Sequence, residues 1–496
     1  MSKPRLAIAA GNGSGTESAA EVARQGGNAV DACLAAAITG WVAEPFFTSL
    51  AGSGFVAVRT PAGDVEVIDG NNAMPHSRPS APNQGVRRTY LEYSNGMYTG
   101  IGGGSVAVPG VLAAVRTAWE RHGRIEWPAL FQGAIRVARE GLPFPKTSAY
   151  YLSVTWKEIW SQFDGSRDLF LVDGRPMLEG ETLRQPDLAD ALERIAHQGP
   201  EVFYSGDIAA AVGDAIARDG GFLGLSDLKA YRAEVRSPVG TDAWGWRIEA
   251  NPPPAVGGAV LVHMLALLGD AALGDPLTRA RALVEAQRAA IGYRAEHYQD
   301  PDGIAAKFDE ALKGLTRRPS PDTTHASSAD AGGYACSITE SNGYGAGLCV
   351  NGILLNNTLG EEELNPFGAH GLPPGTRCHS NMTPTIARGD GKTVAIGSPG
   401  ADRIVTAIAQ TLVRLAVDGA SLQEAVAGPR IHLDSRPTGE LLCYEPGIPG
   451  AEVGYNPLPY DDIHMYFGAV QVASVTDDGE VDAAYDPRRS GGCALV

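Results

Sequence analysis

The sequence predicts a layered α+β protein with a large core. Segments typical of strands, then of helices, then of helices and strands again follow one another along the 496 residues, an order expected of stacked sheets and helices. Apolar residues make up 44% and charged residues 20% of the chain, as in a soluble globular protein. The 62 glycines show no collagen period, so they indicate many tight turns and close backbone approaches.

In the first half of the chain, strands and helices alternate. Gly26 and Gly27 suit the end of one helix, and Asn28 suits the N-cap of the next. Pro252 to Pro254 end a strand, and an apolar helix follows Gly257 and Gly258. The expected elements are a strand over 5–10, a turn over 11–15, a helix over 18–26, strands over 54–59 and 65–69, helices over 110–140 and 179–230, and a helix over 260–268.

A polar, proline-bearing stretch over 312–328 separates this half from the rest. No internal repeat is evident. Beyond the stretch, strands are expected over 334–339, 348–355, 382–387 and 394–396, helices over 404–418 and 421–427, and final strands near 467–475 and 481–485.

Charge and composition exclude several classes of function. The net charge of −17 and the absence of a basic cluster argue against a nucleic-acid partner. No stretch approaches the ~20 apolar residues of a membrane span, and the start of the chain lacks the apolar core of a signal peptide. We therefore expect a cytoplasmic protein with no membrane partner, acting on a small molecule.

Metal and cofactor sites are not expected either. The six cysteines and ten histidines show none of the spacings that hold zinc, so the cysteines are interpreted as thiols in a reducing compartment. The glycine-rich run over 11–15 lacks the spacing of a dinucleotide-binding loop and is interpreted as a plain turn. His432 is interpreted as structural. The sequence thus predicts no cofactor and no metal.

The run Thr323-Thr324-His325 is the sharpest chemical feature. A threonine within a chain is ordinarily an N-cap or a strand residue. Cleavage between Asp322 and Thr323 changes this, because Thr323 then carries a free α-amine with a pKa near 8 that can act as base toward its own hydroxyl. One residue would supply both nucleophile and base.

Such a nucleophile also needs donors for the oxyanion that forms on the substrate. The run over 397–401 (Gly-Ser-Pro-Gly-Ala) offers consecutive backbone N–H groups where a strand meets a helix. The positive end of the helix dipole adds to the stabilisation of an anion there.

With these residues the chain resembles the γ-glutamyltransferase family of N-terminal-nucleophile hydrolases, over nearly its whole length. The matching runs keep one order along the chain, which makes the resemblance highly specific. They are residues 26–32, 108–110, 252–254, 257–258, 323–325, 355–357, 382–385, 397–400, 429–431 and 486–488.

The resemblance implies an αββα sandwich made by a precursor that cuts itself. The products would be a large subunit, 1–322, and a small subunit, 323–496, which stay together as a heterodimer; a dimer of such heterodimers stays open. Thr323 would be the nucleophile for both cleavage and catalysis, with Ser341 or Thr339 as the second hydroxyl beside it. Backbone N–H groups of Gly400 and Ala401 would form the oxyanion hole. Ala401 replaces the usual glycine, which is expected to cost little if its φ is negative.

The substrate pocket departs from the family pattern. Asn71 stands where the family has the arginine that holds the α-carboxylate of the glutamyl group. Arg78, Arg87 or Arg88 could replace that charge only by folding back. Other positions expected to contact substrate are Asn342, Thr358, Glu361, Ser380 and Asn381. Thr358 and Glu361 replace a glutamine and an aspartate of the family, and Ser380-Asn381 replaces a pair of serines.

Three functions therefore stay open. The first is a self-cleaving threonine hydrolase or transferase that acts on an amide, γ-glutamyl or related. The second is a homologue recruited to a biosynthetic pathway, such as that of alkylproline antibiotics, where the resemblance implies hydrolysis of a C–C bond. The third is an inactive, binding-only relative, which the intact Thr323 disfavours.

Overall fold

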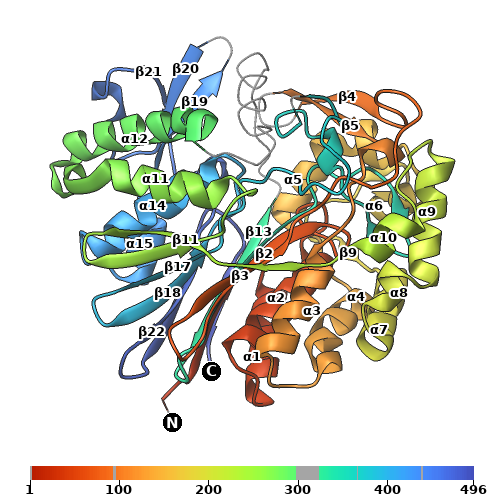
Figure 1. Cartoon of the computed structure of the whole chain (residues 1–496), viewed down its shortest axis with the longest axis horizontal. Coiled ribbons are helices and arrows are strands. Elements are labelled where there is room, and N and C mark those ends of the chain that lie inside the picture. Colours follow the sequence, from red (N-terminus) through yellow and green to blue (C-terminus); the bar gives the residue numbers. More distant parts are fainter. Residues whose placement is uncertain (1–2, 93–95, 298–322, 366, 437–438) are drawn as a thin grey trace.

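The computed structural model describes residues 3–92, 96–297, 323–365, 367–436 and 439–496. Two antiparallel sheets pack face to face at the centre of the molecule, and a layer of helices covers the outer side of each (Figure 1). The layers run helix, sheet, sheet, helix. This confirms the predicted α+β class and the αββα sandwich that the resemblance implies.

The first sheet has seven strands in the order β10-β3-β2-β14-β13-β1-β24. β13 is buried along its whole length, because helices cover one face of the sheet and the second sheet covers the other. The strands are β1 (Leu6–Ala10), β2 (Ser53–Arg59), β3 (Val65–Gly70), β10 (Glu234–Arg236), β13 (Thr324–Asp330), β14 (Ala335–Ser341) and β24 (Gly492–Leu495).

The second sheet has six strands in the order β11-β12-β17-β18-β22-β23. Small side chains such as Ala57, Ala335 and Ala473 fill much of the layer between the sheets, so the two backbones approach closely. The strands are β11 (Val239–Ala243), β12 (Trp246–Ala250), β17 (Thr385–Gly389), β18 (Lys392–Gly397), β22 (Gln471–Thr476) and β23 (Val481–Tyr485).

Helices pack on both outer faces. Among the described residues, no helix is long and apolar enough to cross a membrane. The side of the first sheet carries α1 (Gly13–Arg24), α2 (Ala29–Ala43), α3 (Val111–His122), α4 (Gln132–Glu140), α5 (Lys146–Thr155), α6 (Asp164–Phe170), α7 (Pro186–Gln198), α8 (Glu201–Tyr204), α9 (Asp207–Arg218) and α10 (Leu225–Ala230). The side of the second sheet carries α11 (Gly257–Leu268), α12 (Pro276–His297), α14 (Arg403–Ala416) and α15 (Leu422–Ala427).

Short strands form the remaining, smaller sheets. They are β4 (Arg87–Leu91) with β5 (Met97–Ile101), β6 (Leu142–Pro143) with β9 (Thr182–Leu183), β7 (Leu171–Val172) with β8 (Arg175–Pro176), β15 (Cys349–Val350) with β16 (Ile353–Leu354), and β19 (Ile431–Arg436) with β20 (Gly439–Tyr444) and β21 (Asn456–Pro459).

The ends of the first two helices follow from local hydrogen bonds. Asn28 caps α2 as predicted: its side chain accepts from the Asp31 N–H, and the Asp31 carboxylate accepts from the Asn28 N–H. The turn predicted over 11–15 is wrong. α1 already begins at Gly13, because the Asn12 side chain accepts from the Gly15 N–H at 2.6 Å and caps the helix.

The single strand predicted over 348–355 is also wrong. β15 and β16 form a hairpin with a two-residue turn there, with Cys349 paired to Leu354 and Val350 to Ile353. The turn is Asn351-Gly352, and both residues have positive φ (50° and 75°). Asparagine and glycine tolerate this conformation, which the turns of two-residue hairpins require.

Candidate active site

The register of β13 on β14 brings Thr323 to the end of the inter-sheet layer. Thr324 pairs with Glu340 and His325 with Thr339, so Thr323 follows in line with Ser341. Side chains alternate between the two faces of a sheet. His325 faces the second sheet, where its ring would meet any Cβ on Gly397, and Thr323 shares that face. Thr324 faces the other way and donates a hydrogen bond to Glu44 of α2 at 2.6 Å.

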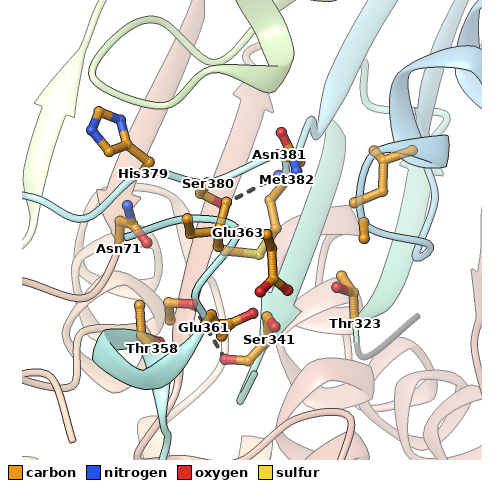
Figure 2. A pocket seen from close by; sticks show the side chains of 14 residues that line it. Asn71, Thr323, Ser341, Thr358, Glu361, Glu363, His379, Ser380, Asn381 and Met382 are labelled. Carbon is orange, nitrogen blue, oxygen red and sulfur yellow. Dashed lines mark hydrogen bonds between the residues drawn. The ribbon is translucent and has the colours of Figure 1, made fainter. Parts of the chain in front are cut away.

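A pocket opens at this position (Figure 2). It joins the end of β14, the segments over 358–364 and 379–382, and the start of α14. The residues that line it are Ser53, Asn71, Thr323, Ser341, Thr358, Glu361, Glu363, Leu364, His379, Ser380, Asn381, Met382, Ala401 and Ile404.

Most of the predicted site residues meet in this pocket. Thr323, Ser341 and Ala401 line it, together with all the predicted substrate contacts except Asn342. Gly400 lies next to its lining. Thr339 lies deeper, with its hydroxyl 2.8 Å from Nδ1 of His325. Asp322 lies outside the described residues, so the predicted cleavage point stays a prediction.

The position of the two hydroxyls separates Ser341 from Thr339. Ser341 reaches the pocket, whereas Thr339 is fully buried and engaged by His325. Burial lowers the pKa of His325 to about 3, so this imidazole is neutral and serves as a fixed partner of hydroxyl groups. The geometry favours Ser341 as the second hydroxyl beside Thr323.

Buried polar contacts hold the chain around Thr323. Arg489 donates from Nη1 to the Thr323 carbonyl oxygen at 2.9 Å. On the opposite face of β13, Glu44 accepts from Thr324 and from Asn12 Nδ2 at 2.8 Å. Burial raises the pKa of Glu44, and the hydrogen bonds oppose that shift. Thr323 is thereby fixed through its own carbonyl group and through its neighbour.

The loop over 397–402 connects β18 to α14, as predicted for an oxyanion loop. Gly400 has φ 125°, and a Cβ there would lie 2.9 Å from the Cα of Gly468, so the position requires glycine. Ala469 donates from its N–H to Ser398 Oγ at 3.1 Å and fixes the start of the loop.

The condition under which alanine would cost little at position 401, a negative φ, is not met. Its φ is 53°, in the left-handed region that an L-residue with a Cβ adopts only with strain. The conformation follows from the sharp bend between Gly400 and the first turn of α14, where the Arg403 N–H bonds to the Gly400 carbonyl at 2.9 Å. Ala401 retains the backbone shape that a glycine would have there.

The side chain and the carbonyl group of Asn71 both bond to other parts of the protein. Its Nδ2 donates to the Cys378 carbonyl at 2.5 Å, and its Oδ1 accepts from the Asn72 N–H at 3.0 Å. Its own carbonyl oxygen accepts from Tyr231 Oη at 2.6 Å and from Arg377 Nη1 at 3.1 Å. The side chain therefore forms part of the pocket wall and supplies no charge to a ligand.

The other predicted substrate contacts are also held in place. A Cβ on Gly343, whose φ is 59°, would lie 2.7 Å from Oε1 of Glu361, so this glycine lets the carboxylate approach the backbone. Thr358 Oγ1 accepts from Asn72 Nδ2 at 2.7 Å. Asn342 is fully buried, and neither its Nδ2 nor its Oδ1 has a hydrogen-bond partner within the described ranges. Ser380 and Asn381 lie where the chain meets the start of α11.

Sequence reasoning missed several lining residues, of which Glu363 and His379 are titratable. Both lie in the long segment between Leu359 and Thr383, which shows no hydrophobic periodicity that could place side chains. The one signal in the sequence is the run of three glutamates over 361–363, which indicates that a second carboxyl group could lie near Glu361 in the pocket.

The pocket carries carboxyl groups but no cationic side chain. None of its described lining residues is lysine or arginine, while Glu361 and Glu363 both reach it. Arg87 pairs instead with Asp219 at 2.9 Å and Arg88 with Glu362 at 2.5 Å. The pocket as described thus lacks the arginine that would hold a carboxylate bidentately. No three potential metal ligands gather anywhere in the part of the chain that the structure describes.

Comparisons with known proteins show the family of the chain. The family model described as "Gamma-glutamyltranspeptidase" matches residues 15–319 and 305–496. The glutathione hydrolase proenzyme of Escherichia coli is 29% identical over 97% of this chain and 90% of its own length. The acylase ACY 1 proenzyme of Pseudomonas sp. (strain V22) is 31% identical over 87% of this chain and 82% of its own.

Solved structures show the same fold. Cephalosporin acylase from Bacillus halodurans superposes with a TM-score of 0.81 at 22% identity, over 99% of this chain and 96% of that one. The "Structure of LmbA2991T421A" superposes with a TM-score of 0.79 at 21% identity, over 100% and 98%. With the family model spanning nearly the whole sequence, the chain belongs to the gamma-glutamyltranspeptidase family and is an enzyme of the N-terminal-nucleophile hydrolase or transferase type.

Proposed function

We propose that this protein cuts itself before Thr323 and then hydrolyses or transfers the acyl group of a small amide through an acyl-enzyme on Thr323. The observation that carries the proposal is the pocket that Thr323 shares with Ser341 and Ala401. Two relatives that match most of this chain are named proenzymes, which supports a precursor that matures into a heterodimer.

The chemistry follows from the groups around Thr323. The free α-amine takes the proton of Oγ as Oγ attacks the substrate carbonyl carbon. Backbone N–H groups of Gly400 and Ala401 stabilise the oxyanion, and Ser341 orients the nucleophile. The ammonium then protonates the leaving amine as the C–N bond breaks. Water, or an acceptor amine, attacks the ester by the same route and regenerates Thr323.

The charges of the pocket define the acyl group it accepts. Glu361 and Glu363 favour a positively charged nitrogen, whereas none of the described lining residues is a lysine or arginine that could hold a carboxylate. We therefore propose an acyl group that carries an amine but lacks the α-carboxylate of glutamate.

The variant Thr323→Ala tests the nucleophile. We expect the purified variant to remain a single folded polypeptide on a denaturing gel, because the core does not depend on one hydroxyl. Wild type should give two fragments, the smaller one beginning at Thr323 on N-terminal sequencing. Two fragments from the alanine variant would show that another residue is the nucleophile, with Thr324 as the next candidate.

Three anilides that differ by one group each test the acyl preference. The 4-aminobutyryl anilide is the γ-glutamyl anilide without its carboxylate, and the glutaryl anilide is the same compound without its amine. We expect kcat/KM to fall in the order 4-aminobutyryl, γ-glutamyl, glutaryl. A leading rate for γ-glutamyl would show that the pocket still recognises glutamate.

A C–C bond hydrolase is the second candidate, favoured by the loss of the glutamyl-binding arginine at Asn71. Thr323 would then attack one carbonyl of a β-diketone, and the leaving enolate would be protonated at carbon. Turnover of a diketone in D2O with deuterium on the released ketone, and no turnover of any anilide, would select this activity.

A further inference from the structure

The pocket beside Thr323 and Ser341 is called the acyl pocket below. Glu363 extends into it from the segment that follows the 3-10 turn Thr358–Gly360. Figure 2 shows its carboxyl group pointing toward Ser341 and Thr323. The group thus approaches the reacting atoms from the side of the pocket that carries Glu361.

A rigid donor holds this carboxyl group. Tyr344 donates from Oη to Oε1 of Glu363 at 2.7 Å. Tyr344 is fully buried, its N–H donates to Asn357 Oδ1 at 2.7 Å, and its carbonyl oxygen accepts from Tyr151 Oη at 2.8 Å. Because the donor is fixed at its backbone on both sides, the position of the Glu363 carboxyl group is fixed as well.

We propose that Glu363, positioned by Tyr344, is a second anionic binding group of the acyl pocket, which contacts a positively charged nitrogen of the acyl group and makes the enzyme select amine-bearing donors. The inference rests on the proposed function at Thr323 and adds a specificity-determining residue to it. A carboxylate without a lysine or arginine among the described lining residues is poorly stabilised until a cation arrives, so the ligand itself completes the pair.

The selectivity should depend on pH. Burial raises the pKa of Glu363 to about 7, the Tyr344 hydrogen bond opposes the shift, and the charges of Glu362 and Asp402 add to it. Protonated below this pH, the group attracts an ammonium ion only weakly; ionised above it, it binds the ion.

Other charged or titratable groups face the same region. Glu361 and Glu362 come from its own segment, and Glu362 is paired with Arg88 of β4. Asp402, at the start of α14, is paired with Arg403 at 2.8 Å and lies 3.4 Å from His432. His379 lines the pocket, and the α-amine of processed Thr323 lies at its end. Imidazole and α-amine groups ordinarily titrate near neutral pH, so the experiment controls for both.

The experiment measures the ratio of kcat/KM for 4-aminobutyryl anilide to that for butyryl anilide, from pH 6 to pH 8. The Thr323 amine serves both donors equally, so its titration cancels in the ratio. We expect the wild-type ratio to rise up to about tenfold over this range, as the ionised fraction of a group with a pKa near 7 grows from about a tenth to about nine tenths.

Matched variants identify the residue whose ionisation causes the rise of the ratio with pH, called the step below. Glu363→Gln keeps the shape and should give a low, flat ratio. In wild type the Tyr344 hydrogen bond favours the ionised form of Glu363. Its loss in Tyr344→Phe should therefore raise the pKa of Glu363 and move the midpoint to higher pH. Glu361→Gln should lower the ratio but keep the step, and His379→Gln should keep the step at its wild-type midpoint.

The outcomes separate this inference from the proposed function. A wild-type ratio near one, a step that persists in Glu363→Gln, or a step that disappears in His379→Gln each overturns the role of Glu363 while leaving Thr323 chemistry intact. A chain that stays uncut and turns over neither donor overturns the proposed function instead. If Glu363→Gln does not fold, an unmoved midpoint in Tyr344→Phe overturns the inference.

Discussion

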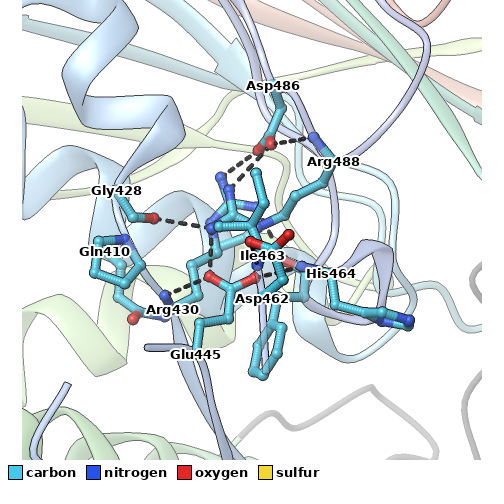
Figure 3. A network of polar contacts seen from close by, with 12 residues as sticks. Gln410, Gly428, Arg430, Glu445, Asp462, Ile463, His464, Asp486 and Arg488 are labelled. Atoms are coloured by element: carbon cyan, nitrogen blue, oxygen red, sulfur yellow. Dashed lines mark hydrogen bonds and ion pairs between the residues drawn. The ribbon is translucent and has the colours of Figure 1, made fainter. Parts of the chain in front are cut away.

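Two buried groups of charged side chains differ in how their charge is compensated. The arginine–carboxylate cluster (Arg430, Glu445, Asp486 and Arg488) balances two cations with two anions (Figure 3). Arg488 donates from Nη1 to Asp486 at 3.0 Å and from Nε to Glu445 at 2.8 Å. The acyl pocket instead brings Glu361 and Glu363 together without a lysine or arginine in its described lining.

The difference separates a scaffold from a site. Within the cluster, Arg430 also donates to the Phe467 carbonyl at 3.1 Å, one residue before the Gly468 that packs on Gly400. Its charges are satisfied internally, so they fix the backbone behind the oxyanion loop and have little capacity left for a ligand. The Glu363 carboxyl group, which accepts from the Tyr344 hydroxyl group, has no arginine or lysine beside it in the described lining of the pocket.

Removing one charge from the cluster should have the largest effect on stability. Asp486→Asn keeps the shape but leaves Arg430 and Arg488 with one carboxylate between them. Breaking a buried pair in this way costs about 3–5 kcal/mol. Urea unfolding followed by circular dichroism should show a loss of this size.

Glu340→Gln is the matched change at a buried carboxyl group without a cation. Burial raises the pKa of Glu340 to about 8, with hydrogen bonds from Trp41 and Thr48 opposing the shift. A folded-state pKa above the unfolded value means that stability falls as pH rises from about 4.5 to about 8 and stays low above that. The variant should therefore be more stable than wild type at pH 9 and similar at pH 5. Equal losses in Asp486→Asn and Glu340→Gln would contradict the comparison.

Local signals in the sequence predicted much of the fold. Asn28 followed by Asp31 identifies a helix start, and β2 and β3 fall where their apolar runs lie. Asn351-Gly352 is an equally local hairpin signal, whereas the apolar residues on either side of it predict one long strand. The strand-to-helix junction over 397–402, the predicted oxyanion loop, lies where adjacent residues in the sequence place it.

Features set by distant contacts were not predictable. The requirement for glycine at position 400 depends on the close approach of Gly468, across more than sixty residues of chain. The position of the Glu363 carboxyl group depends on a hydrogen bond from Tyr344, which lies in a different loop. Ser341 and Thr339 could be separated only once the register of β13 on β14 was known.

Adding a cation to the pocket is the next largest change. Asn71→Arg restores the family residue that pairs with an α-carboxylate. Because a hydrogen bond to a charged group contributes about 1.5–3 kcal/mol, we expect kcat/KM for γ-glutamyl anilide to rise roughly 10- to 150-fold relative to 4-aminobutyryl anilide. The matched control Asn71→Gln adds length without charge and should leave that ratio unchanged. A high wild-type rate on γ-glutamyl anilide, with no gain from arginine, would contradict an acyl pocket that lacks a carboxylate partner.

Relieving the strain in the oxyanion loop should have the smallest effect. Ala401→Gly removes a Cβ from a left-handed residue, which gains about 1–2 kcal/mol, while the greater freedom of glycine in the unfolded chain costs about 0.5–1 kcal/mol. We expect a net gain of at most about 1.5 kcal/mol, seen as a small rise in Tm, and a kcat within about twofold of wild type, because the backbone N–H remains. Gly400→Ala is the opposite case: its Cβ would lie 2.9 Å from the Gly468 Cα at a φ of 125°, so it should lower both Tm and kcat. A large loss of kcat in Ala401→Gly would show that the methyl group itself contacts the substrate, and that this side of the pocket selects by shape as well as by charge.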